Sequence, residues 1–413
     1  MEQQKLGSEL CLGYADPAVD NLLKHSLRTQ LEALSNALVK NEQRQETLQQ
    51  CFTDTISLVL SQSETSHEKL QRSFIQMYDH AVQSMAQAGL GHDILTRQYI
   101  GETGLIMSPM NCRHTIKDIY RIKGFAQGID RAINQFLKRK DVIHILYPAC
   151  GPFAPLLLPL LQYYKTNRLF DGTQIKVTLI DVHPGAVAAV TQLIDDLSVS
   201  DFIDEVVEHD ATKYIPDNAY DLLVLEAMQH GFSQEGQLSI AKHLVQFLTI
   251  DGAIIPNKVS VKGMMVIGET EFNTQWREAQ YTHSKNMNDA VEKDRVELGE
   301  VLSITKDSLL KMEEISLDGG INVIAGNKIT IPENVVDMNE RIFAVYAHLD
   351  VFSDIGIGQY DSGITHPKPD MSFYVDTLPR NIEGAHFSVM GGESVQFYYQ
   401  LSGLPGFIPT KVQ

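Results

Sequence analysis

Short apolar runs alternate with helically patterned stretches between Ile116 and Asn257. The runs Val142–Tyr147, Lys176–Ile180 and Leu222–Leu225 are rich in valine, isoleucine and leucine. Such runs are typical of strands that are buried on both faces of a parallel sheet, with helices covering the sheet. The alternation therefore predicts an α/β domain with a doubly wound parallel sheet over residues 111–256.

The first hundred residues have a helical pattern. Between Asp16 and Gly101, apolar side chains recur at spacings of three and four, with few glycines or prolines. This spacing predicts amphipathic helices, and we expect an N-terminal helical domain over residues 1–110 that carries no chemistry of its own. It either covers the next domain or pairs with a second copy, and we expect a homodimer. The residues that define the pattern are Leu22, Leu23, Leu27, Leu31, Leu34, Leu38, Phe74, Met77, Ala81 and Met85.

Strand-like alternation dominates the chain after Pro256. We therefore expect a β-barrel-like C-terminal domain over residues 257–413, with mostly antiparallel strands. Helical stretches are expected near Asp289–Leu298 and Lys306–Glu314. The expected strands are Lys258–Ile267, Gly320–Ile331, Arg341–Val351, Met371–Thr377 and Ser394–Leu401.

Composition narrows the classes of partner. No apolar run reaches the roughly 20 residues of a membrane span, and the N-terminus lacks a signal-peptide pattern, so we expect a cytoplasmic protein without a membrane partner. A net charge of −18 argues against a nucleic-acid partner and is compatible with a cationic substrate, although acidity also serves solubility. The spacing of the cysteines fits neither a disulfide framework nor a zinc site, so we expect free thiols and no metal. The four cysteines are Cys11, Cys51, Cys112 and Cys150.

Small and acidic residues follow the first three expected strands. Ala149, Cys150 and Gly151 form a small-residue turn, which lets a ligand lie close to the backbone at a helix N-terminus. Asp181, at the end of the next strand, can accept hydrogen bonds from both hydroxyls of a ribose, and Asp210 can accept from an adenine amino group. An ordinary strand-to-helix turn and two capping carboxylates would give the same residues. The strand ends converge, however, where doubly wound sheets bind ligands.

This arrangement resembles the class I methyltransferases that use S-adenosyl-L-methionine. The main competitor is a nucleotide-dependent oxidoreductase. A dinucleotide site needs two further glycines for the pyrophosphate to approach the backbone, and here Pro152 and Phe153 occupy that region. A methyl donor without phosphates tolerates their loss. The resemblance therefore implies a Rossmann-like domain that binds S-adenosyl-L-methionine through the turn, Asp181 and Asp210.

Two glutamates bound the loop after the fourth expected strand. Glu226 stands at the carboxyl end of a buried strand, and Glu235 follows nine positions later. Two carboxylates at such a mouth can hold a planar cation, and a guanidinium suits them because it presents several donors in a fixed fork. A helix-capping acid and an unrelated surface charge would give the same spacing.

The loop resembles the hallmark of the protein-arginine-type N-methyltransferases. That hallmark has two glutamates nine positions apart and a methionine two positions after the first, as in Glu226, Met228 and Glu235. The resemblance implies that the glutamates are catalytic and that all three residues bind the acceptor. The following run Ala241–Pro256 is similar to the family's helix, strand and exit into its barrel.

Two further segments carry the resemblance. Lys117–Phe125 is similar to the family's Lys-Asp-x-x-Arg-x-x-x-Tyr helix, which implies that Arg121 pairs with the carboxylate of the methyl donor. The segment from Thr365 to Pro367 is similar to the family's Thr-His-Trp loop. In the family, the loop histidine and the helix aspartate form a pair at the catalytic centre. Here the resemblance implies that Asp118 and His366 are that catalytic pair.

The departures from the family concern the acceptor. Ala227, Gln229 and His230 stand where the family has tryptophan, glycine and tyrosine, and Pro367 replaces a tryptophan. The helical N-terminal domain has no counterpart in common members. We therefore predict an N-methyltransferase that acts on the guanidino group of arginine, and we favour free L-arginine, a small-molecule substrate, over an arginine-containing peptide or protein. A methyltransferase with another small-molecule acceptor and a non-catalytic scaffold that retains the fold stay open.

Overall fold

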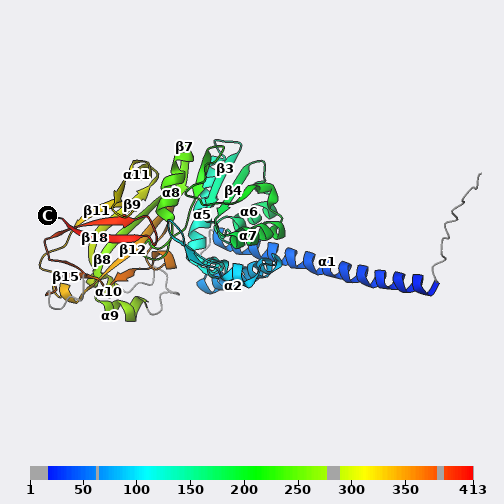
Figure 1. Ribbon diagram of the computed structural model, residues 1–413, viewed down its shortest axis with the longest axis horizontal. Coiled ribbons are helices and arrows are strands. Elements are labelled where there is room, and N and C mark those ends of the chain that lie inside the picture. The colour runs from blue at the N-terminus through cyan, green and yellow to red at the C-terminus, as the bar shows by residue number, and fades with distance from the viewer. Residues whose placement is uncertain (1–16, 62–64, 277–288, 379–385, 413) are drawn as a thin grey trace, which may run out of the picture. The chain divides into compact units, whose positions relative to one another are not determined.

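The computed structural model describes residues 17–61, 65–276, 289–378 and 386–412 (Figure 1). The chain forms two compact units, Met1–Leu48 and Gln49–Gln413. Cys11 lies outside the described residues, as do the side chains of Leu22, Leu23 and Leu34. The predicted division into domains at residues 110 and 256 stays a prediction.

The first unit contains the N-terminal part of helix α1 (Pro17–Leu60). The predicted helix is confirmed. The side chains of Leu27, Leu31 and Leu38 on it are exposed. None of the helices in the described part of the chain is both long and apolar enough to span a bilayer.

The second unit begins with helices. Helix α2 (His67–Gln87) buries the apolar face that the spacing predicted, including Phe74 and Met77, against helix α7 (Pro184–Leu197) and the turn before α5 (Ile119–Phe136). The segment between α2 and α5 also contains two short helices and two short strands. They are α3 (His92–Thr96), β1 (Tyr99–Ile100), β2 (Leu105–Ile106) and α4 (Pro109–Cys112).

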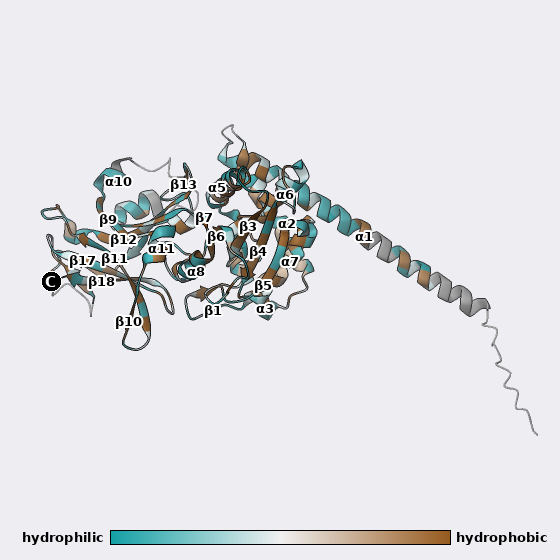
Figure 2. Ribbon diagram, turned by 90° about the horizontal axis from the view of Figure 1, so that it is seen from above, coloured by the Kyte–Doolittle hydropathy of each residue, from teal (hydrophilic) through white to brown (hydrophobic). Residues whose placement is uncertain are grey.

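A five-stranded parallel sheet forms the centre of the second unit. Its order is β5-β4-β3-β6-β7, and every neighbouring pair is parallel. Figure 2 shows hydrophobic residues concentrated in β3 and β4, with helices beside them. The order confirms the predicted α/β class with a Rossmann-like, doubly wound sheet. The strands are β3 (Ile143–Pro148), β4 (Ile175–Asp181), β5 (Ile203–Glu208), β6 (Tyr220–Val224) and β7 (Leu248–Ile255).

The direction of strand addition changes between β3 and β6. The chain passes outward from β3 to β4 and β5, and then returns to place β6 and β7 on the other side of β3. Doubly wound sheets bind ligands at such a reversal, in the crevice at the carboxyl ends of the strands on either side of it. Helices α6 (Leu158–Asn167) and α8 (Gln237–Leu244) also belong to this part of the chain.

The C-terminal strands form two antiparallel sheets, in agreement with the prediction. Their orders are β13-β12-β8-β9, with β14 beside β12, and β10-β11-β17-β18. The two sheets approach each other at Gly326, where an added side chain would meet the carbonyl of Val301. A separate pair, β15 and β16, is parallel. The strands are β8 (Lys258–Val266), β9 (Val296–Thr305), β10 (Glu314–Leu317), β11 (Ile321–Thr330), β12 (Ile342–Phe352), β13 (Ile355–Ile357), β14 (Lys368–Asp370), β15 (Phe373–Val375), β16 (Phe387–Val389), β17 (Ser394–Gln400) and β18 (Gly406–Val412).

Two C-terminal helices are shorter than their sequence pattern indicates. Helix α10 (Asp289–Asp294) ends at Asp294, because Val296 already pairs with β8 as the first residue of β9. Helix α11 (Lys306–Lys311) ends before Glu314, where β10 begins to pair with β11. In both cases strand pairing in the folded protein overrides a local helical pattern.

Candidate active site

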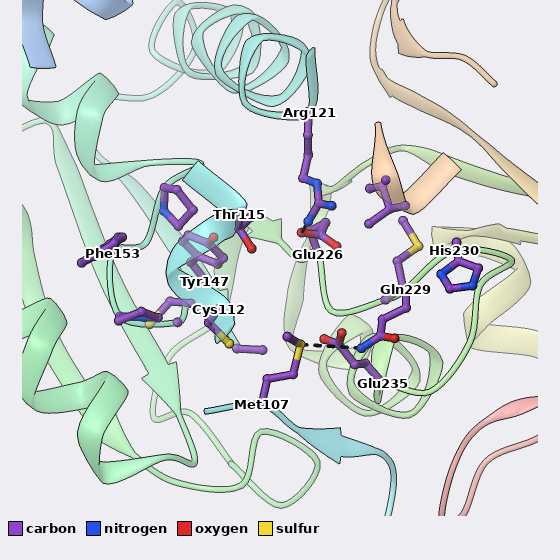
Figure 3. Close-up of a pocket in the computed structure, with 18 residues that line it drawn as sticks. Met107, Cys112, Thr115, Arg121, Tyr147, Phe153, Glu226, Gln229, His230 and Glu235 are labelled. Atoms are coloured by element: carbon purple, nitrogen blue, oxygen red, sulfur yellow. Dashed lines mark hydrogen bonds and ion pairs between the residues drawn. The ribbon is translucent and has the colours of Figure 1, made fainter. Parts of the chain in front are cut away.

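Two adjoining hollows open at the carboxyl ends of β3, β4 and β6, and Figure 3 shows the larger of them. The larger hollow has a volume of about 390 Å³, and Arg121, Glu226 and Met228 are among the residues that line it. The smaller hollow, of about 130 Å³, is lined by Asp181 and Asp210. The residues common to both walls are Met107, Cys112, Ala149, Gly151 and Glu235. The predicted donor and acceptor residues therefore lie in neighbouring spaces with a shared boundary.

The turn after β3 closes onto the end of β4. The backbone N–H of Gly151 donates to Oδ2 of Asp181 at 2.9 Å, and the N–H of Cys150 donates to the carbonyl of Ile180. Ala149 and Gly151 both have positive φ angles, of 50° and 65°. An added side chain at Gly151 would meet only Cys112, at 3.9 Å, so the turn leaves open space beside its backbone.

Asp181 is a half-buried carboxylate held by backbone donors. Besides Gly151, the N–H of His183 donates to its Oδ1 at 2.8 Å. Burial raises the pKa of Asp181, while these backbone hydrogen bonds oppose the rise. The carboxylate is thus fixed in orientation at the wall of the smaller hollow, as a ribose-binding group requires.

Asp210 lines the same hollow but also stabilises its own turn. Its Oδ1 accepts hydrogen bonds from the backbone N–H and the hydroxyl of Thr212, at 2.9 and 2.7 Å. Its Oδ2 lies 3.6 Å from Nζ of Lys213. The turn-capping interpretation therefore describes its present contacts, and its contact with an adenine amino group stays a prediction.

Arg121 joins two carboxylates in the larger hollow. It lies in the first turn of α5, whose N-terminus is capped by Asp118. Its Nη1 lies 2.9 Å from Oε2 of Glu226, and its Nη2 lies 2.9 Å from Oδ2 of Asp118. Although burial opposes it, the pKa of Arg121 is raised by these two carboxylates. The guanidinium expected to hold the donor's carboxylate therefore pairs here with two side chains of the protein.

The direct pair implied between Asp118 and His366 is not among the contacts of the described residues. Oδ2 of Asp118 instead accepts from the hydroxyl of Ser362 at 2.7 Å and from the N–H of Gly363 at 3.1 Å. His366 packs edge-on against Tyr360, with ring centroids 4.9 Å apart, and burial lowers its pKa. His366 is also absent from the described walls of both hollows.

Ser362, which contacts Asp118 where the histidine was expected, also caps the short helix Gly363–Thr365. Its hydroxyl accepts from the N–H of Ile364, and it forms a reciprocal capping box with Thr365. A serine before a short helix is a common N-cap, so the sequence could have indicated the cap but not the contact with Asp118. The loop thus contacts Asp118 through a serine four residues before the histidine.

The two glutamates occupy one buried site with different surroundings. Burial raises the pKa of Glu226, although Arg121 opposes the rise by charge and by hydrogen bonding. Burial and the charge of Glu226 raise the pKa of Glu235 to about 7. Two like charges in a desolvated site hold protons more tightly than in water unless a cation joins them. The larger hollow is therefore chemically suited to a cation.

The backbone next to Glu235 is held by long-range contacts that no sequence motif indicates. The N–H of Leu105 donates to the carbonyl of Gln234 at 2.7 Å, and the N–H of Gln234 donates to the carbonyl of Pro405 at 2.8 Å. A side chain added at Gly104 would lie 2.8 Å from the carbonyl carbon of Glu235. The chain before α4 and the end of the C-terminal region therefore hold the loop from two directions.

The base of the glutamate loop is closed by Gln237. Its Oε1 accepts from the N–H of Ala227 at 2.6 Å, and its Nε2 donates to the carbonyl of Leu225 at 3.3 Å. Gln229 and His230, two of the family departures, line the larger hollow. Further lining residues that sequence reasoning did not identify as site residues are Met107, Cys112, Thr115, Tyr147, Pro155, Gly363 and Ile364.

Among the known proteins compared, this chain is similar to solved structures only. No family model and no curated protein matches the chain. The chain is similar to the Trypanosoma brucei PRMT1 enzyme–prozyme heterotetrameric complex with AdoHcy, with 10% identity over 73% of this chain and 98% of that chain, at a TM-score of 0.40. It is also similar to Arabidopsis thaliana protein arginine methyltransferase 10, with 11% identity over 73% of this chain and 97% of that chain, at a TM-score of 0.43. The chemistry of the site therefore rests on its own residues.

Proposed function

We propose that the protein is an S-adenosyl-L-methionine-dependent N-methyltransferase that acts on a guanidino group, with free L-arginine as the favoured acceptor. One observation carries the proposal. Glu226 and Glu235 both line the larger hollow, and Glu235 also forms part of the wall of the neighbouring hollow that contains Asp181. A cation held by the two carboxylates would lie beside a ligand held by Asp181.

The residues of the smaller hollow fit the methyl donor. Asp181 would accept from its ribose hydroxyls, Asp210 from its adenine amino group, and the turn from Ala149 to Gly151 would lie along it. Arg121 would bind its carboxylate, sharing its donors with Glu226 and Asp118. When bound, this donor supplies a methyl group that is already activated by its attachment to a sulfonium.

The two glutamates would prepare the acceptor for methylation. A free guanidinium is a poor nucleophile because its lone pairs are delocalised. Glu226 and Glu235 would hold it, draw positive charge toward the nitrogens they contact, and leave one nitrogen directed toward the smaller hollow. Alignment and exclusion of water supply much of such catalysis. The buried carboxylates also interact with the cation more strongly than they would in water.

The proton lost from the guanidinium needs an acceptor, for which Glu235 and His366 are the candidates. Glu235 contacts the larger hollow, and burial and the charge of Glu226 give it a pKa of about 7, suited to accepting a proton at neutral pH. His366 is turned toward Tyr360. We therefore favour Glu235 as the proton acceptor, with Asp118 holding Arg121 and the Ser362 loop.

Free arginine and protein arginine compete as acceptors. Gln229 and His230 line the larger hollow where the resembling family has glycine and tyrosine, so the acceptor's surroundings differ from those of a protein-methylating enzyme. The net charge of −18 also permits a basic protein substrate. The altered hollow favours free arginine. Incubation with free arginine and with an arginine peptide, in separate reactions, distinguishes the two.

A methyltransferase with another acceptor and a non-catalytic scaffold can each be distinguished from the proposed function by experiment. With another acceptor, Glu226 would act as a general base and Glu235 would be incidental, so Glu235→Gln would keep its turnover. A non-catalytic scaffold would bind no methyl donor in isothermal titration. The expected homodimer is a separate prediction, tested by sedimentation.

The glutamate variants test the proposal directly. Glu226→Gln and Glu235→Gln should each lower turnover at least about 100-fold, because each removes one of the charges that hold the cation. Binding of the donor should persist in isothermal titration. The exposed Glu340→Gln is a matched control and should behave as the unmodified protein. Near-normal turnover of Glu226→Gln would show the mechanism to be wrong.

A further inference from the structure

Gln229 places an amide against the wall that the two hollows share. Its Nε2 lies 3.6 Å from Sδ of Met107, and Figure 3 shows the amide beside the carboxylate of Glu235. Both of these neighbours belong to the wall that the two hollows share. The resembling family has a glycine at this position, so the contact is a feature of this chain.

The backbone fixes Gln229 and Glu235 relative to each other. Gln229 and Ser233 pair across a tight turn, with the N–H of Gln229 donating to the carbonyl of Ser233 at 3.1 Å. The N–H of Glu235 donates to the same carbonyl at 2.8 Å. Gly231 and Phe232 have φ angles of 65° and 51° in the turn, and the ring of Phe232 is fully buried. The two side chains are therefore carried by a backbone with little freedom.

The surroundings of Glu235 act on its carboxylate in opposite directions. Burial raises the pKa of Glu235 most, and the charge of Glu226 raises it further. The Gln229 amide and the charge of Arg121 lower it. Arg121 is already paired with Glu226 and Asp118. Gln229 thus provides a neutral N–H donor beside the carboxylate of Glu235. The other titratable groups that interact with Glu235 through charge are Asp181 on β4, Cys112 on α4 and Tyr399 on β17.

We propose that Gln229 is a positioning residue whose amide orients the carboxylate of Glu235 to receive the acceptor cation, with Met107 also in contact with the amide. The proposal rests on the proposed function for its catalytic consequence, although the contact itself is independent of it. Without the amide, Glu235 would keep its proton to higher pH and would lose one fixed orientation.

Gln229→Met tests this role, because methionine retains much of the size and flexibility of glutamine but has no N–H donor. The pH profile of kcat/KM with free arginine should shift its acid limb upward. At pH 7 the activity should fall about tenfold, the factor expected for one hydrogen bond to a charged group, and it should largely recover by pH 9. The exposed Gln246→Met is the matched control and should leave the profile unchanged.

A second readout does not depend on methyl transfer. The pH dependence of urea unfolding in Gln229→Met, compared with that of the double variant with Glu235→Gln, reports the proton affinity of Glu235. We expect the midpoint of this pH dependence to lie at a higher pH in Gln229→Met than in the unmodified protein. An unchanged midpoint, or a loss of activity that is equal at every pH, would overturn the positioning role. If the unmodified protein methylates no guanidine, the proposed function fails, and the unfolding comparison still decides the role of Gln229.

Discussion

Replacing Glu235 with glutamine removes a buried charge from the larger hollow and leaves the size of the side chain nearly unchanged. Burial and the charge of Glu226 raise the pKa of Glu235 from its ordinary 4.5 to about 7. At about 1.4 kcal/mol per pH unit, this difference is worth about 3 kcal/mol. Because the folded protein binds this proton more tightly than the unfolded chain, stability is lost as the pH rises from about 4.5 to 7.

The substitution should therefore stabilise the protein in a pH-dependent manner. By urea unfolding, we expect Glu235→Gln to raise the free energy of unfolding by about 3 kcal/mol at pH 8 and by less than about 1 kcal/mol at pH 5. The exposed Glu340→Gln should change it by less than about 0.5 kcal/mol at either pH. A destabilised variant at pH 8, or an equal effect at both pH values, would refute the assignment of a strained, ionised carboxylate to this site.

Four further results are expected. The kcat/KM of the unmodified protein should fall as the pH drops below about 7, because protonated Glu235 no longer attracts a cation; a flat profile from pH 6 to 8 would contradict this. Asp181→Asn should weaken donor binding about tenfold or more in isothermal titration, because it loses a charged acceptor, and unaltered affinity would remove Asp181 from the donor site. Gly104→Ala should lower turnover with unchanged circular dichroism, since its side chain would press on the backbone of Glu235; full activity would show that the loop can yield. Ser362→Ala should lower kcat several-fold by releasing the loop from Asp118, and an unchanged kcat would make that contact incidental.

The sequence predicts the centre of the fold well for a physical reason. Strands β3, β4 and β6 are largely buried on both faces, so each appears as a predominantly apolar run. Parallel strands with a reversal of order then bring their carboxyl ends together, which places Asp181 and Glu226 in neighbouring hollows. Local composition and a general rule of topology were sufficient for this part.

Contacts between distant segments could not be predicted in the same manner. The support of Glu235 by Gly104 and Leu105 depends on chain folding across 130 residues, and neither residue belongs to a motif. The expected contact between Asp118 and His366 is not formed. The hydroxyl of Ser362, four residues before His366, donates to the carboxylate of Asp118 instead. The helical pattern near Asp289–Leu298 is likewise overridden where β9 pairs with β8.

Methyl transfer from labelled S-adenosyl-L-methionine tests the central claim most directly. The protein and its Glu226→Gln variant are incubated with free arginine, an arginine peptide and acceptors that lack a guanidine. We predict label on free arginine with the unmodified protein, and at least about 100-fold less with the variant. Label on the peptide with none on free arginine would overturn the favoured acceptor. Label on no guanidine at all, while the protein binds the donor, would contradict guanidine methylation itself.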